Sequence, residues 1–260
     1  MLSNFFLYLR LIIVVVIVII NIISFKILPE IYSHMFFIKI IETLIYILNF
    51  KIYVHGNTDN LKKNKLLVMC NHYDGIDFIA LSNILSPNKL YTIVKHDLVG
   101  GSNHQSFISD MFYYFKNAFY YSGCFIPYKR GDKDDSAIIK KIIVEKIENN
   151  NNILIFPEGR ARTDGIPEDF KHGIFKLAVE NKLNILPISI KYDKNAGSEM
   201  NGPVDLFKWL DLSANIHVHD IVSSENKDFL KLKDEVFKII TSVLIDKVDK
   251  VDKVDNAEKV

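Results

Sequence analysis

The chain has few cysteines and almost no net charge. Its two cysteines, Cys70 and Cys124, both lie in apolar runs. This favours buried thiols in a reducing compartment over a disulfide framework. The formal net charge of +1 argues against a dedicated nucleic-acid binder, because such proteins carry a strongly basic surface. No asparagine lies in an Asn-x-Ser/Thr sequon, which is compatible with a domain that faces the cytosol.

Spacings typical of metal sites are also scarce. His72, Asp74 and Asp77 have the chemistry of metal ligands, but no His-x-x-x-His pair and no cysteine pair accompanies them. His217 and His219 lie on one face of an expected strand with a ligand-like spacing. Such a pair is more often part of a solvated strand face than of a metal site. We therefore expect no metal.

One long apolar segment lies near the start of the chain. Residues 5–25 contain an uninterrupted apolar run from Leu11 to Ile20 and only three polar residues. About 20 apolar residues span a bilayer as a helix, so residues 1–28 are predicted to form a transmembrane anchor. A cleaved signal peptide is disfavoured, because residues 25–29 offer no small-residue cleavage site. The lysines that follow the anchor place the main domain in the cytosol by the positive-inside rule.

A second apolar segment and a charged tail flank the main domain. Residues 29–51 are apolar but carry Lys39 and Glu42 on one helical face, which suits an interfacial amphipathic helix. A helix docked on the soluble core is an equal alternative. Residues 246–260 repeat Asp, Lys and Val, which predicts a solvated, low-complexity tail because only valine can be buried.

Between these segments, residues 52–245 alternate expected strands and helices. Strands are expected over 52–55, 65–70, 90–94, 124–128, 152–156, 185–192 and 216–222. Helices are expected over 76–86, 104–120, 134–149 and 170–182, with a last amphipathic helix near 229–244. This alternation predicts one α/β domain, with helices on the faces of its sheet.

The first candidate for chemistry is the stretch Asn71–Phe78, which follows a buried apolar run. His72 and Asp77, five residues apart at an expected strand-to-helix switch, suit a general base and the acid that orients it. Taken alone, the stretch is better explained as a polar turn in which Asp74 caps the following helix.

A second candidate is the pair Lys129 and Arg130, which ends the expected strand 124–128. Ligands of open α/β sheets collect at the carboxyl ends of the strands. Arginine there suits a phosphate, because its fork binds two oxygens at once. A basic surface turn is the plain alternative.

The third candidate follows the expected strand 152–156. Gly159 would let the backbone approach a ligand closely, and Glu158 could accept hydrogen bonds from a polyol. Arg160 or Arg162 could hold a phosphate. Pro157-Glu158-Gly159 is also a good turn sequence in its own right.

Together these blocks resemble the lysophosphatidic acid acyltransferase family of glycerolipid acyltransferases. In family order they are Asn71-His72-x4-Asp77, Ile126-Pro127-Tyr128-Lys129-Arg130, Phe156-Pro157-Glu158-Gly159, Phe170-Lys171-x-Gly173 and Leu186-Pro187-Ile188. The resemblance covers roughly residues 50–200 and implies a mixed, mostly parallel sheet flanked by helices, with an N-terminal membrane helix. The family commonly has Thr-Arg after the third block, where this chain has Arg160-Ala161-Arg162.

The resemblance implies a membrane-bound enzyme that moves an acyl group from acyl-CoA to the free hydroxyl of lysophosphatidic acid, giving phosphatidic acid. His72 would be the general base and Asp77 its orienting acid. The implied substrate-binding residues are Lys129, Arg130, Glu158, Gly159, Arg160 and Arg162. No cofactor is implied beyond acyl-CoA as donor substrate. The expected location is the endoplasmic reticulum or an equivalent lipid-synthesising membrane.

Other functions stay open at this point. The acceptor could be another lysophospholipid, such as lysophosphatidylinositol or lysocardiolipin, and the reaction could be a transacylation. A metal-dependent hydrolase that uses His72, Asp74 and Asp77 is a different class of enzyme. A membrane-anchored interaction protein, with residues 246–260 as its docking element, is the non-catalytic alternative.

Overall fold

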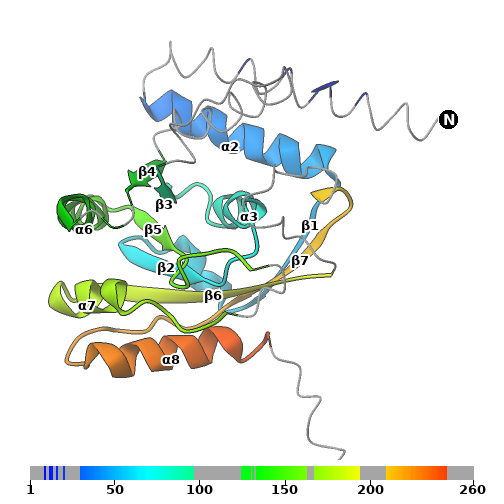
Figure 1. Ribbon diagram of the computed structural model, residues 1–260. Helices are drawn as coiled ribbons and strands as arrows, with labels where there is room; N and C mark the ends of the chain where they lie inside the picture. Colours follow the sequence, from blue (N-terminus) through cyan, green and yellow to red (C-terminus); the bar gives the residue numbers. More distant parts are fainter. Residues whose placement is uncertain are drawn as a thin grey trace, which may run out of the picture.

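A mixed β-sheet forms the centre of the molecule (Figure 1). The computed structural model describes residues 30–96, 124–129, 131, 133–162, 167–193 and 209–244, together with Leu9, Ile12, Ile13, Val16 and Ile20. Within these residues the sheet has seven strands. In spatial order they are β1 (Lys51–Gly56), β7 (Ser213–Val218), β6 (Asn184–Tyr192), β2 (Leu66–Cys70), β5 (Asn152–Ile155), β3 (Leu90–Lys95) and β4 (Phe125–Tyr128).

Five neighbouring strands of the sheet, from β6 to β4, run parallel to one another. β7 is antiparallel to β6, and β1 is parallel to β7. The carboxyl ends of the five parallel strands therefore meet at one edge of the sheet, which is where ligands bind in open α/β folds. The expected mixed, mostly parallel sheet is confirmed.

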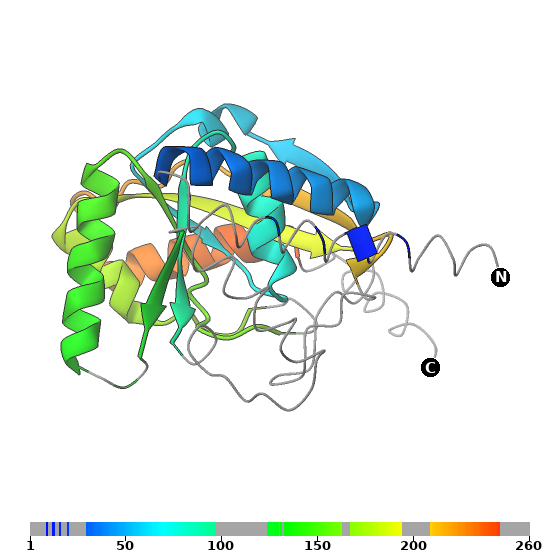
Figure 2. The same ribbon diagram turned by 90° about the horizontal axis from the view of Figure 1, so that it is seen from above.

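Helices cover both faces of this sheet (Figure 1). α2 (Glu30–Ile47) and α3 (Ile76–Ile84) lie on one face, while α7 (His172–Glu180) and α8 (Phe229–Thr241) lie on the other. α6 (Lys133–Glu148) packs beside β4 and β5, as the view from above shows (Figure 2). A short 3₁₀ helix, Thr58–Lys62, joins β1 to β2.

β2 lies at the centre of the sheet and every residue of it is buried. Val68 and Cys70 join the core cluster under α2 and α3. Leu67 and Met69 join the cluster on the opposite face, with α6, α7 and α8. This alternation follows from the two-residue period of a strand, and burial on both faces explains why the segment reads as a continuous apolar run.

α2 is docked on the core. Phe37, Ile41 and Leu44 are buried in the same cluster as Phe78 of α3, and the rings of Phe37 and Phe78 lie 6.1 Å apart. The outer face carries an ion pair between Lys39 and Glu42. The docked alternative for this segment is thus observed, while contact of residues 29–51 with a membrane stays a prediction.

Three expected segments lie outside the described residues. These are most of the anchor over 1–28, the helix over 104–120 and the tail over 246–260. Among the helices that the structure does describe, none has the length and apolar character that crossing a bilayer requires.

The expected strand over 216–222 has different bounds. β7 begins at Ser213 and ends at Val218. Val222 instead forms an isolated antiparallel bridge with Ile185, through two backbone hydrogen bonds of 2.9 Å. The apolar positions of this segment do not reveal such a break, because Val218 and Val222, on either side of it, are both buried.

His219, just after β7, links β6 to α8 through a serine. Ser189 Oγ donates its hydrogen to the carbonyl of Ile240 at 2.7 Å and lies 2.8 Å from His219 Nε2. Because the hydroxyl hydrogen is already used, Oγ accepts from Nε2–H. Burial, together with the neighbouring His217, lowers the pKa of His219 to about 4. The neutral imidazole is therefore the form that fits the fold.

We expect stability to depend on the protonation of His219. Its pKa is lower in the folded protein than in the unfolded chain, so the stability it contributes is present above about pH 6.5 and is lost as the pH falls through about 4. His219→Gln keeps a donor without a titrating group. As the pH falls between these two values, the thermal unfolding midpoint should decrease more in the wild type than in the variant. Identical pH dependence would show that His219 is not the group involved.

Candidate active site

The candidate site begins at Asn71, the first residue after β2. Asn71 is fully buried. Its amide donates to the carbonyl of Ile190 and accepts from the N–H of the same residue, each at 2.9 Å. The Asn71 side chain thus takes the place of the backbone hydrogen bonds that a further residue of β2 would form with β6. The backbone can therefore turn away from the sheet at His72, while β6 continues to Tyr192.

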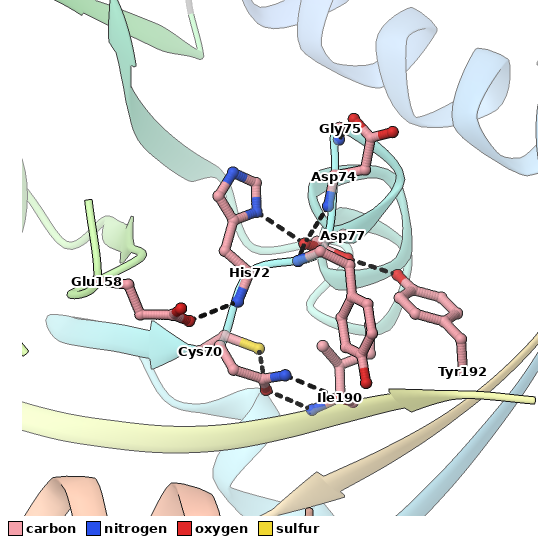
Figure 3. A network of polar contacts seen from close by, with 10 residues as sticks. Cys70, His72, Asp74, Gly75, Asp77, Glu158, Ile190 and Tyr192 are labelled. Carbon is pink, nitrogen blue, oxygen red and sulfur yellow. Dashed lines mark hydrogen bonds and ion pairs between the residues drawn. The ribbon is translucent and has the colours of Figure 1, made fainter. Parts of the chain in front are cut away.

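His72 and Asp77 form a hydrogen-bonded pair at this turn (Figure 3). His72 Nδ1 lies 2.8 Å from Asp77 Oδ2. The same oxygen accepts the backbone N–H groups of Tyr73 at 2.7 Å and Asp74 at 3.0 Å. Asp77 is fully buried in the first turn of α3, where the helix dipole stabilises negative charge. The expected contact between base and acid is present.

This pairing assigns the tautomer of His72. A carboxylate only accepts hydrogen bonds, so Nδ1 carries the hydrogen and Nε2 keeps a lone pair. The close view shows the other ring nitrogen of His72 turned away from Asp77 (Figure 3). The side chain of His72 is 22% exposed. Part of the His72 side chain is therefore open to solvent.

Phe156 fixes the plane of the imidazole. The two rings are stacked, with centroids 3.9 Å apart and planes at 14°. Phe156 directly follows β5, which pairs with β2. With Nδ1 bound to Asp77 and one ring face covered by Phe156, the direction of Nε2 is set.

The turn after β5 also holds the backbone of His72. Glu158 Oε1 accepts the N–H of His72 at 2.9 Å, and the N–H of Arg162 donates to the His72 carbonyl at 2.8 Å. Gly159 allows this turn to be tight, because its φ is +73°, a conformation that favours glycine. This one turn thus forms hydrogen bonds with both the N–H and the carbonyl of His72.

Glu158 itself is buried and half-satisfied. The residue is 5% exposed, and Oε2 has no hydrogen-bond partner among the described residues. Burial raises the pKa of Glu158 to about 7, although the hydrogen bond from the His72 backbone acts in the opposite direction. Glu158 therefore titrates near neutral pH, next to His72.

The expected phosphate-binding cations lie in two places. Arg160 and Arg162, in the turn beside His72, both form ion pairs with Glu168. Lys129 follows β4, which is the third strand from β2 along the sheet. At about 4.8 Å per strand this places its backbone about 14 Å from the base. Arg130 lies outside the described residues.

Asp74 does not cap α3, contrary to the simple turn alternative. The N-cap residue is Gly75, which forms no side-chain cap hydrogen bond. Asp74 Oδ1 instead accepts the N–H of Gly75 at 2.5 Å. The carboxylate of Asp77 reaches back to the N–H groups before the helix, as the acidic residue of a capping box does.

Three contributors to the site were not predicted from the sequence. Asn71 and Phe156 lie inside the sequence blocks that resemble the family. Their position in these blocks indicated a place near the site, but no role was assigned to them. Tyr192, whose hydroxyl lies 2.7 Å from Asp77 Oδ1, stands outside those blocks. Its position at the end of an apolar strand gave no indication of a polar contact.

The metal-ligand candidates do not gather into a site in the described part of the chain. No three His, Cys, Asp or Glu side chains there are arranged to hold a metal ion. The rings of His217 and His219 lie 4.8 Å apart, but His219 Nε2 is engaged by Ser189.

We expect Glu158→Gln to stabilise the protein above neutral pH. The pKa of Glu158 is higher in the folded protein than in the unfolded chain, so the stability it contributes is present below about pH 4.5 and is lost as the pH rises through about 7. Gln retains an acceptor for the His72 N–H and does not ionise. The gain in unfolding free energy should reach about 1–3 kcal/mol above pH 7 and vanish near pH 4.5.

The matched control is Glu180→Gln, since Glu180 is an exposed carboxylate on α7. Chemical denaturation across this pH range should show little change for the control. A gain for Glu158→Gln that is the same at every pH would contradict the assignment.

Comparisons with known proteins identify the family of the chain. The family model described as acyltransferase matches residues 51–191. A 1-acyl-sn-glycerol-3-phosphate acyltransferase of Borreliella burgdorferi is 26% identical over 209 residues, which cover 80% of this chain and 74% of that protein. The crystal structure of the 1-acyl-sn-glycerophosphate acyltransferase PlsC from Thermotoga maritima matches with a TM-score of 0.61 and 17% identity, over 94% of this chain and 93% of that one.

At this identity the solved structure shows a shared fold. The family match spans more than half of the chain and includes the strand ends that carry His72, Asp77 and Glu158. The chain therefore belongs to the acyltransferase family, and the resemblance of its sequence blocks to glycerolipid acyltransferases is confirmed.

Proposed function

We propose that the protein transfers an acyl group from acyl-CoA to the free hydroxyl of lysophosphatidic acid, giving phosphatidic acid. The observation that carries the proposal is the pair of His72 and Asp77, which are 2.8 Å apart. It leaves Nε2 as a fixed and accessible base. The match to a 1-acyl-sn-glycerol-3-phosphate acyltransferase supports the choice of acceptor.

The chemistry requires a base and no enzyme nucleophile. The acceptor oxygen attacks the thioester carbonyl carbon while its proton passes to His72 Nε2. The C–S bond then breaks, and the departing CoA thiolate takes the proton back from the imidazolium. Asp77 stabilises the imidazolium while it exists, as the acid of a catalytic triad does.

The turn after β5 has the groups to hold the acceptor. Glu158 Oε2, which is buried and has no hydrogen-bond partner among the described residues, accepts a hydrogen bond from a glycerol hydroxyl once the acceptor enters, and the tight turn at Gly159 lets the backbone come close. Arg160 and Arg162 bind the phosphate in place of Glu168, whose exposed carboxylate they hold in the free protein. Arg130, which lies outside the described residues, or Lys129 supplies further positive charge for the phosphate.

The membrane assignment follows from the substrates. Lysophosphatidic acid and phosphatidic acid both partition into lipid, so an enzyme that converts one to the other benefits from an anchor. The proposal includes a single span within residues 1–28, a cytosolic catalytic domain and a location in a lipid-synthesising membrane.

The acceptor is the part of the proposal with a specific competitor. Arg160-Ala161 stands where the family commonly has Thr-Arg, and these residues adjoin the expected phosphate site. Initial rates with a panel of lysophospholipids would decide between lysophosphatidic acid and an acceptor such as lysophosphatidylinositol.

Removal of the base should abolish most of the activity. In His72→Ala, acyl transfer should fall by about 10²- to 10⁴-fold, the usual contribution of a general base. His55→Ala is the control, because His55 is exposed near the end of β1, at the opposite edge of the sheet. Initial rates are compared in membranes with equal amounts of each variant. Near-normal turnover of His72→Ala would rule out the proposed mechanism.

Loss of the phosphate cation should act on the acceptor alone. We expect Arg130→Ala to raise the apparent KM for lysophosphatidic acid by about 10- to 100-fold, the value of a lost charge-assisted hydrogen bond. The KM for acyl-CoA should stay unchanged. Lys129→Ala is the matched variant, and the larger of the two effects identifies the residue that binds phosphate. If acyl-CoA dependence alone changes, neither residue has this role.

A further inference from the structure

Asp77 has two carboxylate oxygens, and only one of them serves the base. Oδ2 contacts His72 Nδ1 and the N–H groups of Tyr73 and Asp74. Oδ1 points the other way and accepts the hydroxyl of Tyr192 at 2.7 Å (Figure 3). Because Asp77 is fully buried, water cannot replace this partner, and a buried carboxylate oxygen without a donor is costly.

Tyr192 is held firmly in this position. It is the last residue of β6, two residues after Ile190, which Asn71 fixes to the end of β2. Its side chain is buried, with the ring of Tyr73 packed edge-on at 4.9 Å and the ring of Phe50 at 6.3 Å. The hydroxyl therefore comes from the end of a central strand of the sheet, and the ring that carries it is packed between Phe50 and Tyr73.

We propose that Tyr192 is a positioning residue for acyl transfer, which holds the carboxylate of Asp77 in the orientation that His72 Nδ1 requires. The inference rests on the proposed function, in which His72 is the base. Three donors on Oδ2 come from the loop and from His72 itself, so they move with the site. The hydroxyl on Oδ1 comes from the sheet and ties the carboxylate to the rigid part of the molecule.

The hydroxyl is suited to this task because it does not ionise. Burial raises the pKa of Tyr192 well above its ordinary value, and the charge of Asp77 raises it further. Tyr192 is therefore a donor at every pH at which the enzyme would work. It also draws electron density from Asp77, which weakens the pull of the carboxylate on the proton of His72.

Other titratable groups face the pair. The Cys70 thiol lies below it on β2, Glu158 lies on the turn after β5, and Tyr73 and Asp74 lie on the loop itself. All of these side chains are present in both the wild type and a variant at Tyr192. A difference between variant and wild type can therefore be assigned to the missing hydroxyl.

The test is Tyr192→Phe, which removes one oxygen and keeps the packing of the ring. We expect kcat to fall about 10-fold, in keeping with one lost hydrogen bond to a charged group, while KM for both substrates stays close to its original value. The acid limb of the pH profile of kcat/KM should move to higher pH, because a carboxylate with one donor fewer attracts the positive charge of a protonated imidazole more strongly. Tyr91→Phe, which alters a buried tyrosine on the opposite face of the sheet, should change neither.

A second variant separates positioning from a general effect on folding. In an Asp77→Asn background, Tyr192→Phe should cost almost nothing further in kcat, because the hydroxyl acts through the carboxylate. All rates are normalised to folded enzyme, measured by thermal unfolding. An unchanged kcat and acid limb in Tyr192→Phe would overturn the inference, as would an equal loss in both backgrounds. If Tyr192→Phe gives either contradicting result while His72→Ala is inactive, the proposed acyl transfer stands and only the role of Tyr192 is wrong. If the wild type transfers no acyl group, the proposed function and the role of Tyr192 are both wrong.

Discussion

The site depends on a carboxylate that is buried among four hydrogen-bond donors. Asp77 is fully buried, and its partners are an imidazole, two backbone N–H groups and a phenol. A buried charge is tolerated only when it is paired and hydrogen-bonded. These donors come from the loop after β2 and from the end of β6. The need to satisfy one carboxylate therefore joins α3, this loop and the sheet, and it leaves His72 with one possible orientation.

A second carboxylate lies close by in a different environment. Glu158 is also buried, but it receives one hydrogen bond, and its pKa is raised to about 7. Carboxylates in different environments can serve different roles in one site. The two oxygens of Asp77 already accept four hydrogen bonds, whereas Glu158 Oε2 has no hydrogen-bond partner within the part of the chain that the structure describes. In the proposed function, Asp77 therefore orients the histidine and Glu158 binds the acceptor.

The sequence predicted most of this fold, for identifiable physical reasons. β2 and β5 are buried on both faces, so they read as continuous apolar runs. His72, Asp77 and Glu158 could be named because strand ends at a common edge bring separate blocks together. The docking of α2 could not be predicted, since an apolar face looks the same whether a membrane or a core covers it. The contact of Tyr192 with Asp77 joins residues 115 positions apart, and no local pattern encodes such a pair.

The proposed mechanism depends on whether His72 Nε2 carries a hydrogen, and ¹⁵N NMR measures the protonation of each ring nitrogen directly. In protein labelled with ¹⁵N-histidine, the His72 signals can be assigned from their absence in a variant that lacks this residue. The proposed mechanism predicts that the neutral ring carries its hydrogen on Nδ1 and has a bare Nε2. A hydrogen on Nε2 would contradict it, because the nitrogen that must accept the substrate proton would already be occupied.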